Sequence, residues 1–471
     1  MDERSLAFAG IRELGQALRT GETTPLQLAT FALSRLERLG PRLNAVVTVT
    51  RARALEEAAK AQDELTSGLD RGPLHGIPYG AKDLLATGGG IPTTWGAAPF
   101  RQQQFAEDAA VITRLRDAGA VLVAKLAMVE LAGGFDYDQP NASFTGPGIN
   151  PWDIHRWSSG SSSGSASAVA AGLVPFAIGS ETWGSILSPA AACGLSGLRP
   201  TYGRVSRHGA MALSWSLDKI GPICRSADDC GLVLAAIAGA DPLDADDRTE
   251  SWRYEGIRSA SRPFRLAVPR GLTDDGLLQP AVRERFGQAI EELRSCADIE
   301  EVDLPDFPHV EVTQLILKAE TASAFEGFLA AGGPAGLAAP ESRTAGYAGT
   351  TIPAVAYLRA LRIRGQIARA WKRLLQPYDA LVAPTISHVA SKLNERFSEA
   401  EWPHSPAAVR DIAAAGNVAG LPAISVPSGF DAAGLPTAVA FLGSAHSEQR
   451  MLEVAAAYQE RTTWHSRHPE W

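Results

Sequence analysis

Cysteine is scarce in this chain, and long apolar segments are missing. The 471 residues include four cysteines, none of them in a C-x-x-C pair: Cys193, Cys224, Cys230 and Cys296. This usage fits reduced thiols better than a disulfide framework. No apolar stretch reaches the roughly 18 residues that a spanning helix needs, and the first residues lack the pattern of a secretory signal. The sequence therefore predicts a cytoplasmic protein that does not enter a membrane.

Motifs for bound metals and nucleotides are also missing. The nine histidines form no H-E-x-x-H or comparable cluster, and no G-x-x-x-x-G-K-S/T loop occurs. The formal net charge of −8 argues against nucleic acid and anionic membranes as partners. We therefore expect a protein that uses no metal, no cofactor and no nucleic acid.

Strand-like and helix-like segments alternate along the chain. Hydrophobic residues make up 45% and charged residues 20%, which is typical of a globular protein with a substantial core. We expect strands at 44–49, 121–125, 174–178, 264–268, 379–384, 423–426 and 438–442, and helices at 25–39, 50–67, 109–118, 280–295 and 448–461. This alternation predicts an α/β fold. Gly40-Pro41 should end the first helix, Asp108 should cap the third, and the acidic segment 240–251 should form a surface loop.

A serine-rich stretch at 156–203 organises the rest of the chain. Seven serines surround Gly160 and Gly164 within 158–167, where the apolar run 166–173 begins. Flexible linkers have a similar composition, but a linker seldom leads straight into a helix and a strand. We therefore expect a structured turn whose backbone N–H groups can hold phosphate or a developing oxyanion.

A second serine turn and one lysine complete the candidates for catalysis. The turn GSETWGSI (179–186) follows a strand, and a nucleophilic serine needs its hydroxyl on such a turn beside N–H donors. Lys82 lies in GIPYGAKD (76–83), among small and apolar residues that can desolvate its amine and make it a base. Taken singly, such a serine is usually a turn residue and such a lysine a solvated charge.

Taken together, these segments resemble the amidase signature family. The matching motifs, in the family's order, are GIPYGAKD (76–83), SGSSSGS (159–165), GSETWGSI (179–186) and PAAACGLSGLRPTYGRVS (189–206). The resemblance implies a large mixed β-sheet covered by α-helices on both faces, in a single domain over 1–471. An N-terminal helical segment (1–68) would precede a core at 69–240 and 379–471. The least family-like region, 310–376, would cover the substrate pocket.

The resemblance also implies a role for each motif residue. Ser185 would be the nucleophile, Ser161 the bridging serine held by a cis peptide, and Lys82 the base. Ser162 would support the turn. The backbone N–H groups of the second turn would form the oxyanion hole, namely those of Thr182, Trp183, Gly184 and Ser185. Separately, we expect four residues as candidates for the substrate pocket: Met128, Gly133, Gly134 and Trp183. For the loop that carries Met128, a simple turn remains the alternative.

Four positions depart from the family pattern. Ser159 and Ser163 stand where the family has glycine, and ordinary φ angles would make them harmless. Leu187 stands where many members have arginine. Trp183 replaces the first glycine of G-G-S, so we expect it at negative φ, with its indole either packed beneath the turn or directed into the substrate pocket.

Three functions are compatible with these motifs. The leading one is a free-standing amidohydrolase that cleaves a small-molecule amide through a serine acyl-enzyme, with a homodimer as its expected assembly. The second is the A subunit of a Glu/Asp-tRNA amidotransferase, which shares these motifs. The third is a catalytically silent binding protein on the same scaffold, which the retention of Lys82, Ser161 and Ser185 disfavours.

Overall fold

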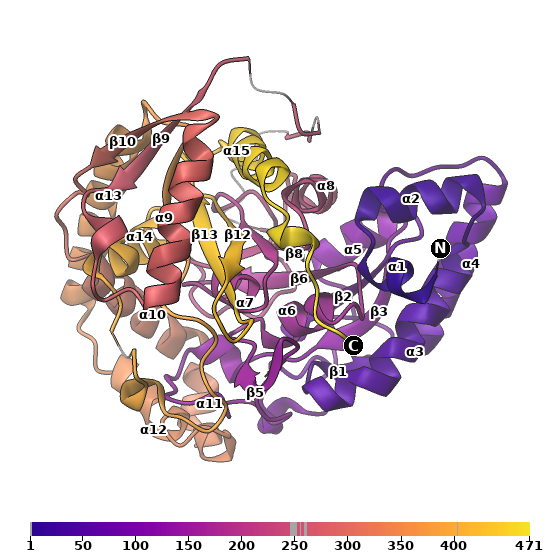
Figure 1. The fold of residues 1–471 in the computed structure, drawn as a ribbon. Helices are drawn as coiled ribbons and strands as arrows, with labels where there is room; N and C mark the ends of the chain where they lie inside the picture. Colours follow the sequence, from indigo (N-terminus) through magenta and orange to yellow (C-terminus); the bar gives the residue numbers. More distant parts are fainter. Residues whose placement is uncertain (1, 245–251, 255, 259–260, 403) are drawn as a thin grey trace.

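A mixed sheet of eleven strands runs through the molecule, with helices on both sides (Figure 1). The structure, a computed structural model, describes residues 2–244, 252–254, 256–258, 261–402 and 404–471. The acidic loop expected at 240–251 lies largely outside these residues. The strands are β1 (Val46–Val49), β2 (Pro78–Lys82), β3 (Val121–Leu126), β4 (Ile149–Asn150), β5 (Asp153–Trp157), β6 (Phe176–Glu181), β7 (Ser196–Arg199), β8 (Lys219–Cys224), β9 (Phe264–Pro269), β10 (Ala297–Val302), β11 (Ala380–Pro384), β12 (Ala423–Phe430) and β13 (Pro436–Leu442).

The order of strands confirms the predicted α/β class with a mixed sheet. Across the sheet it is β1-β3-β2-β6-β8-β7-β12-β13-β11-β9-β10, while β4 and β5 form a separate pair. Strand β2 runs parallel to β3 and β6, and β9 runs parallel to β10 and β11. The other neighbours in the large sheet are antiparallel.

Helices of very different length surround the sheet. Within the described residues they are α1 (Glu3–Phe8), α2 (Ile11–Thr20), α3 (Pro25–Leu43), α4 (Arg51–Thr66), α5 (Ala110–Asp117), α6 (Ser163–Ala170), α7 (Leu187–Ala192), α8 (Ala227–Ile237), α9 (Pro280–Arg294), α10 (His309–Ala324), α11 (Glu326–Ala330), α12 (Ser342–Gly349), α13 (Ala354–Leu375), α14 (Ala407–Val418) and α15 (Glu448–Arg461). Those expected from the sequence at 50–67, 280–295 and 448–461 are confirmed as α4, α9 and α15.

Both faces of the sheet are buried. Along β3, Leu122 belongs to one hydrophobic cluster, whereas Val121 and Val123 belong to another. In β6, Ile178 and Ala177 are divided between the same two clusters. Because successive side chains of a strand point to opposite faces, the two clusters lie on opposite sides of the sheet.

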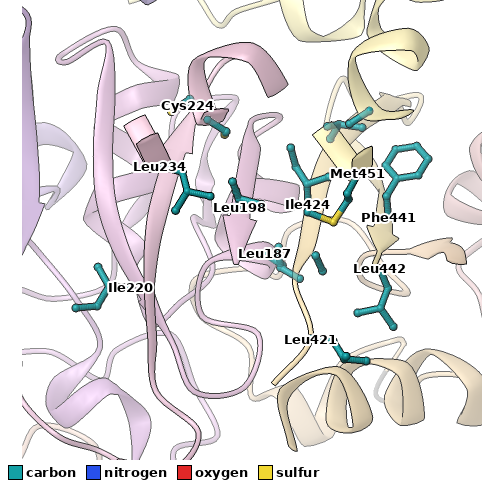
Figure 2. Close-up of a cluster of buried hydrophobic side chains, with 14 of the residues drawn as sticks. Leu187, Leu198, Ile220, Cys224, Leu234, Leu421, Ile424, Phe441, Leu442 and Met451 are labelled. Carbon is teal, nitrogen blue, oxygen red and sulfur yellow. The ribbon is translucent and has the colours of Figure 1, made fainter. Parts of the chain in front are cut away.

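The two halves of the sheet meet where β7 pairs with β12. Leu198 and Ile424 are register partners, and both are fully buried. Figure 2 shows them with Leu187, the first residue of α7, and Met451 of α15 in one apolar cluster. This junction holds α7, and with it the serine turn before α7, against the C-terminal half of the chain.

The predicted end of the first long helix is wrong. Helix α3 continues through Gly40 and Pro41 to Leu43, and Asn44 ends it in the left-handed conformation, with φ of 48°. A proline in the last turn removes one backbone hydrogen bond. Burial of Leu43, which has no exposed surface, offsets that loss.

The predicted cap at Asp108 is also wrong. Helix α5 has Ala109 at its N-cap, without a side-chain hydrogen bond. The Asp108 carboxylate instead accepts two hydrogen bonds from Arg53, each of 2.8 Å, and one from the N–H of Gly88. A charged guanidinium is a stronger partner than a helix N–H group, so Asp108 ties α4 to the loop after β2.

Strand β6 extends further toward the second serine turn than expected. Gly179 pairs with Gly221, and Ser180 pairs with Ile220 of β8. The ladder to β8 therefore holds Ser180 and the residue after it in extended conformation, and the turn begins only at Thr182.

Candidate active site

Lys82 ends β2 and has no exposed surface. Its Nζ lies 2.7 Å from Oγ of Ser161 and 2.9 Å from Oγ of Ser180. Burial lowers the pKa of Lys82 to about 7, although Asp218 and Glu181 oppose that shift. Among the described residues, no carboxylate lies within ion-pair distance of Nζ. The amine is therefore largely neutral just above pH 7 and can accept a proton.

A second buried lysine shows the effect of an ion pair. Nζ of Lys125 lies 3.1 Å from Oδ1 of Asp83, and neither side chain is exposed. Lys125 also donates to the carbonyl of Leu85 and to the hydroxyl of Thr93, each at 2.8 Å. Burial lowers the pKa of Lys125 as well, although Asp83 opposes that shift. Lys125 is not the candidate base because these three partners surround its Nζ and no serine of the two turns is among them.

The first serine turn brings Ser161 to Lys82. The peptide bond directly before Ser161 is cis, as the family resemblance implies. Ser162 instead binds the backbone of Ser180, where its hydroxyl accepts from the N–H and donates to the carbonyl, both at 3.3 Å. The N–H of Ser162 donates to the carbonyl of Ser185 at 3.3 Å. The two serine turns are therefore in direct contact.

Ser159 adopts a conformation that favours glycine. Its φ is 65°, in the left-handed region, so the expectation of an ordinary φ is wrong for this residue. Ser163, the other serine that replaces a family glycine, begins α6 in helical conformation. The backbone conformation therefore explains why the family has glycine at position 159, but it does not explain the glycine at position 163.

Glu181, a residue that was not predicted to be functional, closes the second serine turn. Its Oε2 accepts hydrogen bonds from the N–H groups of Ile186 and Leu187, each of 3.0 Å. Its Oε1 accepts one of 2.7 Å from Arg199. Burial raises the pKa of Glu181, but Arg199 and the other donors outweigh it and lower the pKa to about 2. A charged carboxylate therefore holds the turn around Ser185.

Asp218 secures the start of the same turn. The hydroxyl of Thr182 donates to Asp218 at 2.6 Å. The other carboxylate oxygen of Asp218 accepts from the N–H groups of Leu213 and Ser214, at 2.8 and 3.0 Å. The turn is thus held by a carboxylate at each end, fully buried in Glu181 and half-buried in Asp218. Glu181 lies inside the motif GSETWGSI (179–186), and Asp218 lies inside the family-like segment SLDKIGPICRSADD (216–229), so both could have been found from the sequence.

The middle of the second turn keeps its backbone donors free. Among the described residues, no group accepts a hydrogen bond from the N–H of Trp183, Gly184 or Ser185. The hydroxyl of Ser185 has no described partner either. Gly184 has φ of 87°, whereas Trp183 is not among the residues of positive φ, as expected. Unpaired N–H groups beside a serine hydroxyl can stabilise an oxyanion.

Two cavities flank the serine turns. The first, which we call the Trp183 cavity, has a volume of about 540 Å³ and is lined by Gly160, Trp183 and Ser188 on the serine side. The second, the Thr182 cavity, has about 200 Å³ and is lined by Ser180 and Thr182, among others. Trp183 is half-buried and lines the Trp183 cavity, whereas its place in a substrate pocket stays a prediction.

The other predicted pocket residues lie elsewhere. Met128 is fully buried in the core. A Cβ on Gly133 would meet Tyr137 at 2.6 Å, and one on Gly134 would meet Leu213 at 2.2 Å, so both glycines serve close packing. None of the three lines either cavity. The region 310–376 lines neither cavity as well, and the segment 386–402 supplies most of the far wall of the Trp183 cavity.

A mixed α/β sheet that carries a buried lysine and two joined serine turns defines a class of enzymes that act on amide bonds. The chain belongs to the amidase family, whose model matches residues 27–452. No described helix has the length and apolar character required to cross a membrane.

Relatives of two kinds resemble the whole chain. The A subunit of glutamyl-tRNA(Gln) amidotransferase from Roseiflexus sp. (strain RS-1) is 36% identical, with 97% of this chain and 96% of the relative covered. The crystal structure of peptide amidase from Stenotrophomonas maltophilia superposes with a TM-score of 0.83 at 32% identity, over 98% of both chains. The A subunit of glutamyl-tRNA(Gln) amidotransferase from Thermotoga maritima superposes with a TM-score of 0.76 at 28% identity, over 97% and 95%. The chain is therefore an enzyme of a family that contains both hydrolases and amidotransferase subunits.

The role of Glu181 is testable with the isosteric substitution Glu181→Gln. It leaves the Arg199 guanidinium buried without its countercharge, which typically costs about 3–5 kcal/mol of unfolding free energy. Urea unfolding should show this loss, and activity per folded molecule should fall because the turn around Ser185 is no longer held. In the control Glu301→Gln, an exposed partner of Arg270 is changed, and stability should shift by less than about 1 kcal/mol. Equal stability of the two variants would contradict the role given to Glu181.

Proposed function

We propose that the chain is an amidohydrolase that cleaves the carboxamide of a small molecule, with Ser185 as nucleophile. Oγ of Ser185 attacks the carbonyl carbon, and its proton passes through Ser161 to Lys82 and then to the leaving nitrogen. The C–N bond breaks, ammonia or an amine departs, and an acyl-enzyme remains. Water then adds to the acyl carbon, releasing the acid and restoring Ser185.

The contact between Lys82 and Ser161 is the observation that carries this proposal. A serine hydroxyl 2.7 Å from a buried amine whose pKa is about 7 can lose a proton near neutral pH. Ser185 lies on the turn directly joined to Ser162, with its hydroxyl unengaged among the described residues. Thr182, Trp183, Gly184 and Ser185 would supply the oxyanion N–H groups, and Ser162 would hold the first turn.

Three observations favour a free-standing hydrolase. Leu187, where many members have arginine, is buried in the apolar cluster of Figure 2 and offers no charge to a substrate. Trp183 adds a large ring at a cavity next to the serine turns. Superposition on peptide amidase is also closer than on the amidotransferase protein. We propose a cytoplasmic homodimer that acts on a small-molecule amide.

Covalent labelling tests the identity of the nucleophile. A fluorophosphonate should modify Ser185, and intact mass with peptide mapping should locate the adduct there. Ser185→Ala should abolish labelling, whereas the matched variant Ser188→Ala, three residues further along, should retain it. An adduct on Ser161 or Ser162 with Ser185 unmodified would overturn the assignment, and no adduct at all would favour the silent binding protein.

The pH dependence tests Lys82 as the base. Because burial lowers the pKa of Lys82 to about 7, the reactive neutral amine is lost as the pH falls. We expect kcat/KM to decrease about tenfold per pH unit below 7 and to level off above it. Lys82→Ala should reduce kcat by about 10²–10⁴-fold, while the exposed control Lys60→Ala should keep the wild-type profile. A wild-type rate that does not change between pH 5.5 and 8 would rule out this base.

A second function has specific support. The identity of 36% over 97% of the chain to the A subunit of an amidotransferase favours this role over a free-standing hydrolase at the level of sequence. In that case the same serine chemistry would release ammonia from glutamine for a partner protein. Both functions would use the same catalytic residues. They differ in the substrate and in whether partner proteins are required.

Activity of the purified chain alone separates the two functions. We expect ammonia release from a panel of carboxamides without any added protein, and light scattering should show a homodimer. A coupled glutamate dehydrogenase assay follows the ammonia. Release from glutamine that depends on the other subunits of an amidotransferase would decide for the second function.

A further inference from the structure

Aromatic side chains from separate parts of the chain converge on the Trp183 cavity. Among the residues that line it are Tyr137, Trp157, Trp183 and Phe397. They come from the loop after β3, the end of β5, the second serine turn and the segment after β11. Aromatic residues make up only 7% of the chain, so their concentration at one cavity beside the serine turns is a specific feature.

Three of these rings form one contact group. Tyr137 meets Trp157 and Phe397 edge to face, at centroid distances of 6.1 and 5.9 Å. Trp157 stacks on Phe397 at 5.1 Å, with 27° between the rings. A Cβ on Gly160 would meet the Trp157 ring at 3.0 Å. The aromatic wall therefore reaches the residue directly before Ser161.

The cations at this cavity are already engaged. Arg156 lies 3.6 Å from Asp153 and donates to the carbonyl of Ala390 at 3.2 Å. Lys392 lies 3.6 Å from Glu395. A ligand carboxylate, such as that of glutamine, would have to compete with these partners. The aromatic rings, in contrast, line the cavity with apolar surface and offer no ion pair that a ligand would have to displace.

We propose that the Trp183 cavity binds a flat aromatic group of the substrate, so that the preferred substrates are aromatic carboxamides. The ring of the substrate lies against Trp183 and the group of Tyr137, Trp157 and Phe397, and its carboxamide extends to Ser185. This inference rests on the proposed function, and it names the substrate class of that site. The cavity volume of about 540 Å³ accommodates a single ring with a substituent.

Paired substrates test the preference for a flat ring. Benzamide and cyclohexanecarboxamide have similar size, but only benzamide can stack. We expect kcat/KM to be about tenfold higher for benzamide, which corresponds to about 1.4 kcal/mol and to the gain from one or two aromatic pairs. Glutamine should be a poorer substrate than both. A ratio below about twofold would overturn the proposal.

Substitutions assign the preference to this cavity. Phe397→Leu and Tyr137→Leu each remove a ring from the wall and should lower the ratio to less than about threefold, roughly the contribution of one aromatic pair. Trp215→Leu is the matched control, because Trp215 lines the Thr182 cavity instead. It should keep the wild-type ratio. A ratio that is unchanged in both cavity variants, or that is lost in Trp215→Leu, would contradict the assignment.

A binding measurement keeps this inference separate from the proposed function. Benzamide and cyclohexanecarboxamide are titrated into Ser185→Ala while tryptophan fluorescence is followed. Tighter binding of benzamide, weakened by Phe397→Leu, supports the aromatic site even if Ser185 proves not to be the nucleophile. Equal binding of the two compounds refutes the aromatic site even if fluorophosphonate labels Ser185.

Discussion

The carboxylate of Glu181 joins segments that are far apart in the sequence. It binds the backbone at the start of α7, Arg199 at the end of β7 and, at 3.1 Å, the amide of Asn417 in α14. Placing an ion in the interior is costly unless it is paired and fully hydrogen-bonded. Here the contacts come from three elements, the start of α7, β7 and α14, so the conformation of the serine turn depends on how these elements pack together.

Burial acts on every ionisable group at this site, but the outcome differs with the partner. Glu181 stays charged because a guanidinium lies 2.7 Å away. Lys125 is matched by Asp83 at 3.1 Å. Among the described residues, Nζ of Lys82 has the hydroxyl groups of Ser161 and Ser180 and the carbonyl of Ser180 as partners but no carboxylate, and the cost of desolvation lowers its pKa to about 7. Because desolvation outweighs the nearby carboxylates, the amine of Lys82 can be neutral near pH 7 and accept a proton.

Local patterns predicted the elements whose signals are strong. The apolar runs that became β3, β11, β12 and β13 are continuous because both faces of the sheet are buried. Helix ends were harder to predict. The last turn of α3 passes Pro41 because burial of Leu43 outweighs one lost hydrogen bond, and packing of that kind cannot be read from neighbouring residues.

The order of residues alone was enough to predict the α/β class, to locate the motifs and to pair a lysine with two serine turns. These depend on residue type and on order along the chain, and both are present in the sequence. The three-dimensional packing was needed to show that Met128 is a core residue, that Trp183 lines a cavity and that the segment 386–402 forms the opposite wall. The contacts by which Glu181 and Asp218 hold the second serine turn became visible only in three dimensions as well. A cavity wall, or the setting of a buried carboxylate, is made by residues that are far apart in the sequence. Asn417, for example, lies more than 200 positions from Glu181. Contacts over such separations produce no pattern among neighbouring residues.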